Sequence, residues 1–247
     1  MKTLALYNIK GGVGKTASAV NLAWQMARNG RRVLLWDLDP QGAASFYLRV
    51  KPRIKGSTRK LIAGKLDLDE LIHSTEHDRL DLLPADFSYR HMDLHLDDAS
   101  KSKKRLAGLL KPLRHGYDLV VIDCPPSISL VSENIFRVAD LILVPLIPTI
   151  LSLRTWQQIR QHFDDQSIDP ARLVPFISMA DRRKRLHRET MQQLASEEPT
   201  LLRTVIPYAA DVERMGQERA PLGTFAAHSP AGIASRLLAD AVAARLG

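Results

Sequence analysis

Short runs of apolar residues alternate along the chain with longer segments in which apolar and polar positions follow a helical period. Several runs are hydrophobic without interruption, as at residues 119–122 and 141–144, a pattern typical of parallel strands covered on both faces. The predicted strands are residues 3–9, 33–37, 80–84, 119–123, 141–145, 173–178 and 204–207. The chain therefore predicts an α/β fold with a mostly parallel twisted sheet and helices on both faces.

The segments between the predicted strands indicate how the chain is organised. The first helix is expected over residues 15–29, with Gly30 as its C-terminal cap, because glycine readily adopts the left-handed conformation. Residues 49–65 carry many lysines and arginines and no acid, and we expect them to form an exposed loop. No repeat or linker divides the chain, so residues 1–247 are expected to form a single domain.

Composition and charge narrow the classes of function. Of the 247 residues, 45% are hydrophobic and 25% charged, as in an ordinary soluble globular protein with a sizeable core. The net charge of +8 favours an anionic partner, such as nucleic acid, acidic lipid or a phosphate ligand. The single cysteine, Cys124, cannot form an intramolecular disulfide. The apolar run at residues 4–9 is too short to span a bilayer, and we expect a cytoplasmic protein.

A glycine-rich loop follows the first predicted strand and precedes the first predicted helix. Its residues are Lys10, Gly11, Gly12, Val13, Gly14, Lys15 and Thr16. In this context backbone N–H groups and a helix N-terminus can surround a phosphate chain. Lys15 would reach the β- and γ-phosphates, and the Thr16 hydroxyl would bind Mg²⁺. The ordinary P-loop has a glycine where Ile9 stands, so the strict motif is not met.

The order of lysines and glycines in this loop resembles the deviant Walker A box of the ParA/MinD family of P-loop ATPases. Small partition and positioning ATPases of the ParA/Soj type are the nearest match. The resemblance implies ATP and Mg²⁺ as cofactors and a homodimer that forms with ATP. It also implies that Lys10 reaches the nucleotide of the opposite subunit. The cofactor-binding residues that it implies are Gly11, Gly12, Val13, Gly14, Lys15, Thr16, Ala17, Pro207 and Tyr208.

Carboxylates follow two of the predicted strands. Asp37 and Asp39 come at the end of one strand and Asp123 at the end of another, and neighbouring parallel strands end at the same edge of a sheet. The resemblance assigns Asp123, with Thr16, to Mg²⁺ binding and Asp39 to positioning the attacking water. Asp37 is a weaker candidate beside them. Each aspartate alone has another reading, as a helix cap or a turn residue. The expected catalytic residues are Lys10, Lys15 and Asp39.

The resemblance continues more loosely toward the C-terminus. Residues 178–183 are similar to the Thr-Met-Tyr-Asp-x-Arg stretch of the family, and residues 204–207 are similar to its Thr-Val-Ile-Pro strand. Ser229 and Pro230 precede the last predicted helix, as in the family. The resemblance therefore extends over nearly the whole chain, although its most specific motifs are those of the nucleotide site.

Two basic clusters are candidates for contact with nucleic acid. The first contains Arg182, Arg183, Lys184, Arg185 and Arg188, and the second contains Lys101, Lys103, Lys104 and Arg105. Contacts of this kind reach phosphates, weaken steeply with salt and carry little base preference. Partition members of the family bind DNA non-specifically as ATP dimers, so we expect the first cluster to bind DNA. An ordinary solvated charged face is the alternative for both clusters.

The resemblance leads to a prediction of function. We expect a Mg²⁺-dependent ATPase that binds nucleoid DNA and positions a plasmid, a chromosome or a protein organelle such as a carboxysome. An adaptor protein would stimulate its hydrolysis. The alternatives are a MinD-like membrane-associated regulatory ATPase and a metabolic ATP-dependent enzyme.

A membrane partner is not expected, because the last helix lacks bulky aromatic residues and a dense basic face. Its apolar residues are expected along one side that packs on the core, and they are Ile233, Leu237, Leu238, Val242 and Leu246. Cys124 is expected to pack beside the Asp123 loop. The histidines, among them His162 and His187, show no metal-ligand spacing and are assigned to surface or helix positions.

Overall fold

An eight-stranded sheet forms the centre of the computed structural model, which describes residues 1–54, 56–98 and 104–247. Its strands are β1 (Lys2–Leu6), β2 (Val33–Asp37), β3 (His73–Ser74), β4 (Leu80–Leu83), β5 (Leu119–Asp123), β6 (Leu141–Leu146), β7 (Leu173–Ala180) and β8 (Leu202–Pro207). The order across the sheet is β3-β4-β2-β5-β1-β6-β7-β8. Among the strand pairs that the structure describes, only that of β3 with β4 is antiparallel. The predicted mostly parallel α/β fold is confirmed.

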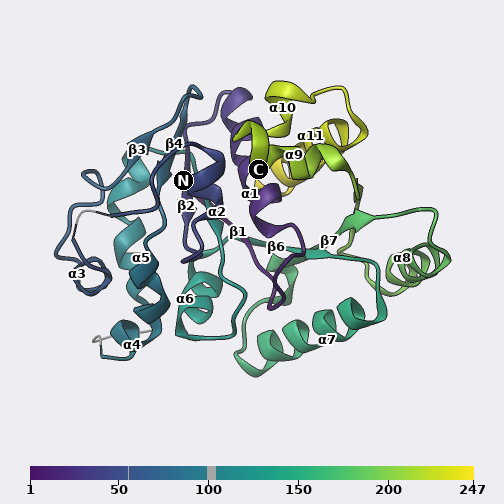
Figure 1. The fold of residues 1–247 in the computed structure, drawn as a ribbon. Coiled ribbons are helices and arrows are strands. Elements are labelled where there is room, and N and C mark those ends of the chain that lie inside the picture. Colours follow the sequence, from purple (N-terminus) through teal and green to yellow (C-terminus); the bar gives the residue numbers. More distant parts are fainter. Residues whose placement is uncertain (55, 99–103) are drawn as a thin grey trace.

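Helices cover both faces of this sheet (Figure 1). The helices are α1 (Lys15–Arg28), α2 (Ala43–Tyr47), α3 (Thr58–Ile62), α4 (Met92–Asp97), α5 (Arg105–Leu110), α6 (Leu130–Val138), α7 (Ile150–Asp165), α8 (Arg185–Glu197), α9 (Ala210–Glu218), α10 (Leu222–Phe225) and α11 (Pro230–Leu246). Single 3₁₀ turns lie at Phe87–His91, Pro112–His115 and Pro170–Arg172. The core on one face takes side chains from α1 and α9–α11, and that on the other takes side chains from α3–α7.

Alternation within β1 shows how one strand serves both cores. Leu4 and Leu6 face the core under α1 and α11, whereas Ala5 and Tyr7 face the core under α6 and α7. Successive side chains of a strand point to opposite faces, so a central strand needs apolar residues at every position. This requirement explains the uninterrupted hydrophobic runs in the sequence.

The predicted strands are present, with differences at their ends. The first strand ends at Leu6 rather than at residue 9. Asn8 leaves the ladder because its side-chain amide donates to the Pro145 carbonyl (2.8 Å) and its side-chain oxygen accepts from the Lys10 N–H (2.9 Å). β3 was not predicted, since its two residues are exposed and carry no apolar pattern.

The expectation that residues 49–65 form an exposed loop is wrong in part. The segment contains α3, whose first turn is capped by Ser57, and it buries Ile54, Leu61 and Ile62 in the core. These three apolar residues are spaced too irregularly to stand out from the surrounding cations. Burial of apolar surface therefore fixes a segment that its composition suggested was loose.

The last helix packs on the core as predicted, but not with every residue named. Leu238, Val242 and Leu246 of α11 are buried. Ile233 and Leu237 are 38% and 51% exposed, so their assignment to the buried side is wrong. Small residues take their place, since Ala231, Ala234 and Ala239 let α11 approach the sheet and α1. In the described ranges, no helix is both long and apolar enough to cross a membrane.

Candidate functional site

The glycine-rich loop joins β1 to α1 in a conformation that needs its glycines. Gly12 has a φ of 71° and Gly14 a φ of 90°, both in the left-handed region that favours glycine. A Cβ at Gly14 would lie 2.8 Å from Ser178 Oγ. A Cβ at Gly11 or Gly12 would meet nothing within 4 Å, so this side of the loop is open toward a ligand.

The two lysines of the loop have different surroundings. The Lys15 ammonium is buried and donates to the backbone carbonyl of Lys10 (2.8 Å). Burial lowers the pKa of Lys15, and the nearby Asp123 carboxylate acts in the opposite direction. Lys10 is only half-buried, and its ammonium makes no ion pair within the described ranges. The Lys15 ammonium is therefore held inside the loop, whereas the Lys10 ammonium has no such acidic partner among the described residues.

Two buried aspartates lie side by side below this loop. Asp37 ends β2 and Asp123 ends β5, and the strand register pairs them directly. Asp37 Oδ2 accepts hydrogen bonds from the backbone N–H and the hydroxyl of Ser45, each at 2.7 Å. Burial raises the pKa of Asp37 to about 6, and the hydrogen bonds from Ser45 oppose the rise.

Asp123 is the less satisfied member of this pair. Burial, followed by the Asp37 carboxylate, raises the pKa of Asp123 well above its ordinary value, whereas the nearby Thr16 hydroxyl and Lys15 ammonium lower it. Neither of its buried oxygens has a hydrogen-bond partner among the residues that the structure describes. A buried carboxylate without partners is costly, and a hard divalent cation would satisfy it. The oxygens of Asp123 and Thr16 suit Mg²⁺, which prefers oxygen ligands.

A cavity of about 330 Å³ opens beside the loop and brings most of the predicted residues together. Those that line it are Gly11, Gly12, Gly14, Lys15, Thr16, Ala17, Asp39, Pro207 and Tyr208. Lys10, Val13 and Asp123 do not line it. The Val13 side chain is buried and is not available to a ligand. Asp39 is half-buried, and its Oδ1 accepts from the Gln41 N–H (3.0 Å).

Other residues that line the cavity were not assigned to it from the sequence. They include Tyr47, Pro126, Ser178, Met179, Ile206, Val212 and Glu213. Tyr208 donates its hydroxyl to Glu213 Oε1 (3.1 Å), and its backbone N–H donates to the Ala180 carbonyl (2.9 Å). Residues from β7, β8 and α9 thus close a cavity that begins at the β1–α1 loop. The only sequence signal for this closure was the weak similarity at residues 178–183 and 204–207.

The basic residues at the start of α8 lie outside this cavity. Arg183 pairs with Asp181 (2.9 Å) and Arg185 with Glu189 (2.6 Å). The Arg188 guanidinium donates to the carbonyls of Arg182 and Arg183, at 2.8 and 3.1 Å. In the described part of the chain, Arg182 and Lys184 make no ion pair. The cluster therefore presents fewer free cations than its sequence suggests.

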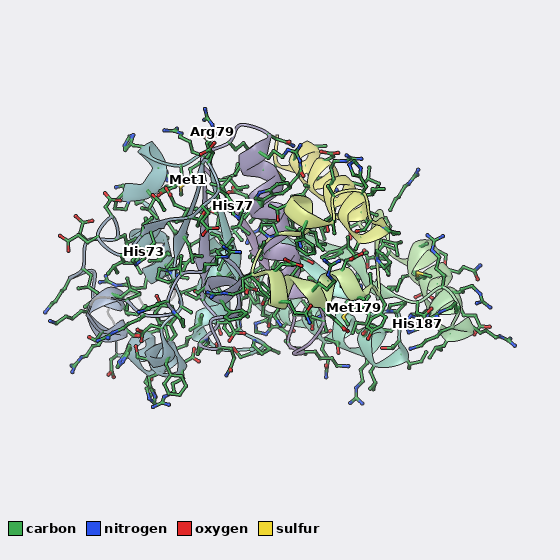
Figure 2. All side chains as sticks on the ribbon, turned by 45° about the horizontal axis from the view of Figure 1, so that its top comes forward. Met1, His73, His77, Arg79, Met179 and His187 are labelled. Carbon is green, nitrogen blue, oxygen red and sulfur yellow. The ribbon has the colours of Figure 1, made fainter. Side chains whose placement is uncertain are left out.

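The structure adds one cation to this region. Arg203 of β8 lines a groove of about 590 Å³ together with Arg182 and Arg188. Met179 and His187, labelled in Figure 2, flank the β7–α8 connection. His187 lies in α8, a helix position as expected, and is buried. Its Nδ1 accepts from the Asp181 N–H (3.1 Å), so it positions this connection.

The second basic cluster, near α5, is only partly described. Lys101 and Lys103 lie outside the described residues. Lys104 is exposed, whereas the Arg105 side chain donates to the Ile62 carbonyl. Cys124 is buried beside Asp123 as expected, and burial raises the pKa of its thiol, which disfavours a nucleophilic role. Within the described ranges, no group of three or more His, Cys, Asp or Glu residues is arranged to hold a metal ion.

Comparison with known proteins agrees with this geometry. A family model described as an AAA domain matches residues 1–168. The chromosome partitioning protein ParA of Myxococcus xanthus is 32% identical over 78% of this chain and 70% of its own length. A crystal structure of cobyrinic acid a,c-diamide synthase from Mycobacterium smegmatis, with bound ADP and magnesium, is 27% identical. It has a TM-score of 0.81 and covers 98% of this chain and 94% of that chain.

The cell division ATPase MinD of Pyrococcus furiosus shares the fold. Its crystal structure has a TM-score of 0.80 at 21% identity and covers 99% of each chain. The family model matches more than half of this chain. The loop between β1 and α1 of this chain carries the lysine and glycine pattern of the deviant Walker A box. The chain therefore belongs to the ParA/MinD family of P-loop ATPases.

Proposed function

We propose that this chain binds Mg-ATP, forms a homodimer around it, hydrolyses it, and uses this cycle to position a cargo on DNA. The observation that carries the proposal is the contrast between the two lysines of the loop. The Lys15 ammonium is bound inside the loop by the Lys10 carbonyl, whereas the Lys10 ammonium is half-buried and has no ion pair in the described ranges. A cation placed in this way is available to the nucleotide of a second subunit.

The roles proposed for the individual residues follow from their positions. The open side of the loop at Gly11 and Gly12 would hold the phosphates with Lys15, and Pro207 and Tyr208 would lie near the adenine. Thr16 and Asp123 would hold Mg²⁺, which neutralises charge on the phosphates when bound. Asp39 lines the same cavity, and its Oδ2 accepts no hydrogen bond from the described residues, which supports its role in orienting the attacking water.

Exposed apolar residues on both sides of the loop support dimerisation at this edge of the sheet. Ile128 follows β5 and is 50% exposed, and Ile150 and Leu151 follow β6 and are 59% and 64% exposed. β5 and β6 are the two neighbours of β1, which leads into the loop. Large apolar side chains exposed in a group commonly mark an interaction surface. A second copy of the chain docked here would cover them and bring in its own Lys10.

Non-specific DNA binding is proposed for the surface at the start of α8. Arg182 and Lys184 have no ion pair in the described ranges. Arg188 and Arg203 line the same groove as Arg182, and the Arg188 guanidinium donates to the Arg182 carbonyl. The name of the Myxococcus relative, a chromosome partitioning protein, favours a role in partition or positioning. We propose nucleoid association in the cytoplasm and an adaptor protein that stimulates hydrolysis. The cargo would be a plasmid, a chromosome or a protein organelle such as a carboxysome.

A metabolic ATP-dependent reaction is the second candidate, and one observation favours it. The Mycobacterium smegmatis synthase is similar over nearly the whole of both chains. The MinD-like membrane alternative is disfavoured, because α11 directs Leu238, Val242 and Leu246 into the core. Ile233 and Leu237 are its exposed large apolar residues, and two such residues form a smaller apolar face than a membrane anchor has.

The test of the proposed function is Lys10→Ala, with Arg114→Ala at an exposed remote position as the control. We expect the Lys10 variant to bind ATP, measured with a fluorescent analogue, but to lose stimulated hydrolysis. Turnover close to that of the unmodified chain would contradict the role of Lys10 in a partner subunit. Co-sedimentation with DNA and with anionic vesicles, in ATP and in ADP, separates the candidates. Binding to vesicles alone would support the MinD-like alternative, and binding to neither would support a metabolic role.

A further inference from the structure

A basic segment beside the nucleotide site has no part in the function proposed above. Residues 49–66 contain no Asp or Glu. Lys51, Arg59, Lys60 and Lys65 are exposed, and none of them makes an ion pair with the residues that the structure describes. Four unpaired cations lie close together in the sequence on a surface that contributes nothing to the nucleotide cavity.

The segment is firmly attached to the body of the protein. Ile54, Leu61 and Ile62 are buried, and the Ile54 N–H donates to Asp86 Oδ2 (3.0 Å). Ser57 caps α3 by accepting a hydrogen bond from the Lys60 N–H (3.3 Å). A cation on an ordered helix loses less entropy on contact with a ligand than one on a free loop. Arg59 and Lys60 are therefore presented by an ordered helix, and Lys51 precedes it in the same anchored segment.

The same segment touches the loop that carries Asp39. Gly42 closes this loop, since its N–H donates to the Asp39 carbonyl (2.9 Å), and its φ is 67°. A Cβ at Gly42 would lie 2.7 Å from Pro52 Cβ, so Pro52 packs directly on the Gly42 backbone. Pro52 follows Lys51 in the chain. A ligand bound by Lys51 would thus lie next to Pro52, which packs against the loop that carries Asp39.

We propose that Lys51, Arg59 and Lys60 form a second contact surface for the phosphates of duplex DNA, and that Pro52 transmits this contact to the Asp39 loop. DNA bound here would change the rate of ATP hydrolysis as well as the affinity of the complex. The proposal rests on the proposed function, because it assigns a surface and a regulatory contact to the same DNA-dependent cycle.

The neighbouring surface favours DNA over an anionic membrane. The apolar face of α3 is buried, so α3 has no side chains to insert into a bilayer. Phosphates of a rigid duplex can reach exposed cations without inserting anything.

The test compares two triple variants. Lys51→Gln/Arg59→Gln/Lys60→Gln removes the proposed surface. Lys2→Gln/Lys111→Gln/Arg114→Gln removes three equally exposed cations at the start of β1 and before β5. Affinity for a short fluorescein-labelled duplex is measured with ATP over about 50–200 mM KCl. Each lost phosphate contact lowers the slope of log K against log[salt] by about 0.9, so the first variant should lose about 2.7. Equal slopes in the two variants would overturn the proposal.

A further variant tests the link to hydrolysis. Pro52→Gly keeps every cation but removes the side chain that packs on Gly42. We expect it to bind DNA with the original affinity, and its hydrolysis rate is measured with and without DNA. The ratio of the rates with and without DNA should fall to one. A ratio unchanged from that of the original chain, or a ratio of one in the original chain, would overturn the link.

Two outcomes separate this inference from the proposed function. If Arg182→Gln/Lys184→Gln abolishes DNA binding while the Lys51 triple variant binds normally, only the inference fails. If the original chain binds no DNA with ATP, the DNA-dependent function itself fails. Anionic vesicles form the last arm of the test, and a triple variant that loses vesicle binding but keeps DNA binding would overturn the choice of DNA.

Discussion

Replacing Asp37 with asparagine tests the electrostatic cost of the buried aspartate pair. Asp37 is fully buried at the end of β2, opposite Asp123. Burial raises its pKa from an ordinary value of 3.8 to about 6. An acid with a raised pKa binds its proton more tightly in the folded chain, so folding favours the neutral form. An asparagine is neutral at every pH, and its side-chain oxygen can keep the two hydrogen bonds from Ser45.

The sign and size of the effect follow from the two pKa values. Below pH 3.8 the aspartate is neutral in both states and costs nothing. As the pH rises toward about 6 the unfolded chain ionises first, so the free energy of unfolding falls, and above about 6 the loss is complete. At about 1.36 kcal/mol for each pH unit between the two pKa values, the full loss is about 3 kcal/mol. At pH 5 roughly half of that loss has accumulated.

The assay is urea unfolding without nucleotide or Mg²⁺, at pH 5 and at pH 8. Asp37→Asn should raise the free energy of unfolding by about 3 kcal/mol at pH 8 and by roughly half as much at pH 5. Asp78→Asn, at an exposed aspartate, is the control and should change neither value. A gain for Asp37→Asn that is no larger at pH 8 than at pH 5 would refute the assignment of a burial cost to this carboxylate.

Four further substitutions test the site and the proposed dimer surface. Asp39→Ala should trap an ATP-bound dimer, because water is no longer oriented, and size analysis with ATP that finds only monomer would contradict this. Gly14→Ala should lower stability by about 1–2 kcal/mol through its left-handed φ and also weaken ATP binding through the contact with Ser178. Gly30→Ala, with a similar φ and no close neighbour, should show only the loss of stability. Leu151→Glu should prevent the ATP-dependent dimer yet leave the unfolding free energy unchanged, as judged by light scattering and urea unfolding.

The central part of the site could be predicted because it depends on residues close in the sequence. A glycine-rich loop between a strand and a helix commonly binds phosphate groups. The lysine at the start of this loop indicated the ParA/MinD family. Asp37 and Asp123 were brought together by a general property of parallel sheets, whose strands end at one edge. The carboxylates that follow neighbouring strands must therefore meet there.

The distant part of the site could not be predicted in the same way. Ser178, Val212 and Glu213 reach the cavity only because β7, β8 and α9 are placed beside the first loop. The sequence also does not show which charged residues form ion pairs. In the structure, Arg183 pairs with Asp181 and Arg185 pairs with Glu189. Similarly, the cations of residues 49–65 suggested a loose loop, although the burial of Ile54, Leu61 and Ile62 anchors it.

The sequence by itself determined the class of the fold, the phosphate-binding loop and the family. These depend on hydrophobic period and on short motifs, whose physical consequences are local. Only the tertiary structure decided which cations remain free, which aspartate lacks partners, and that Pro52 rests on the Asp39 loop through Gly42. Each of these depends on which side chains and backbone groups come into contact in the packed structure, and the pattern of residue types along the chain does not give those contacts.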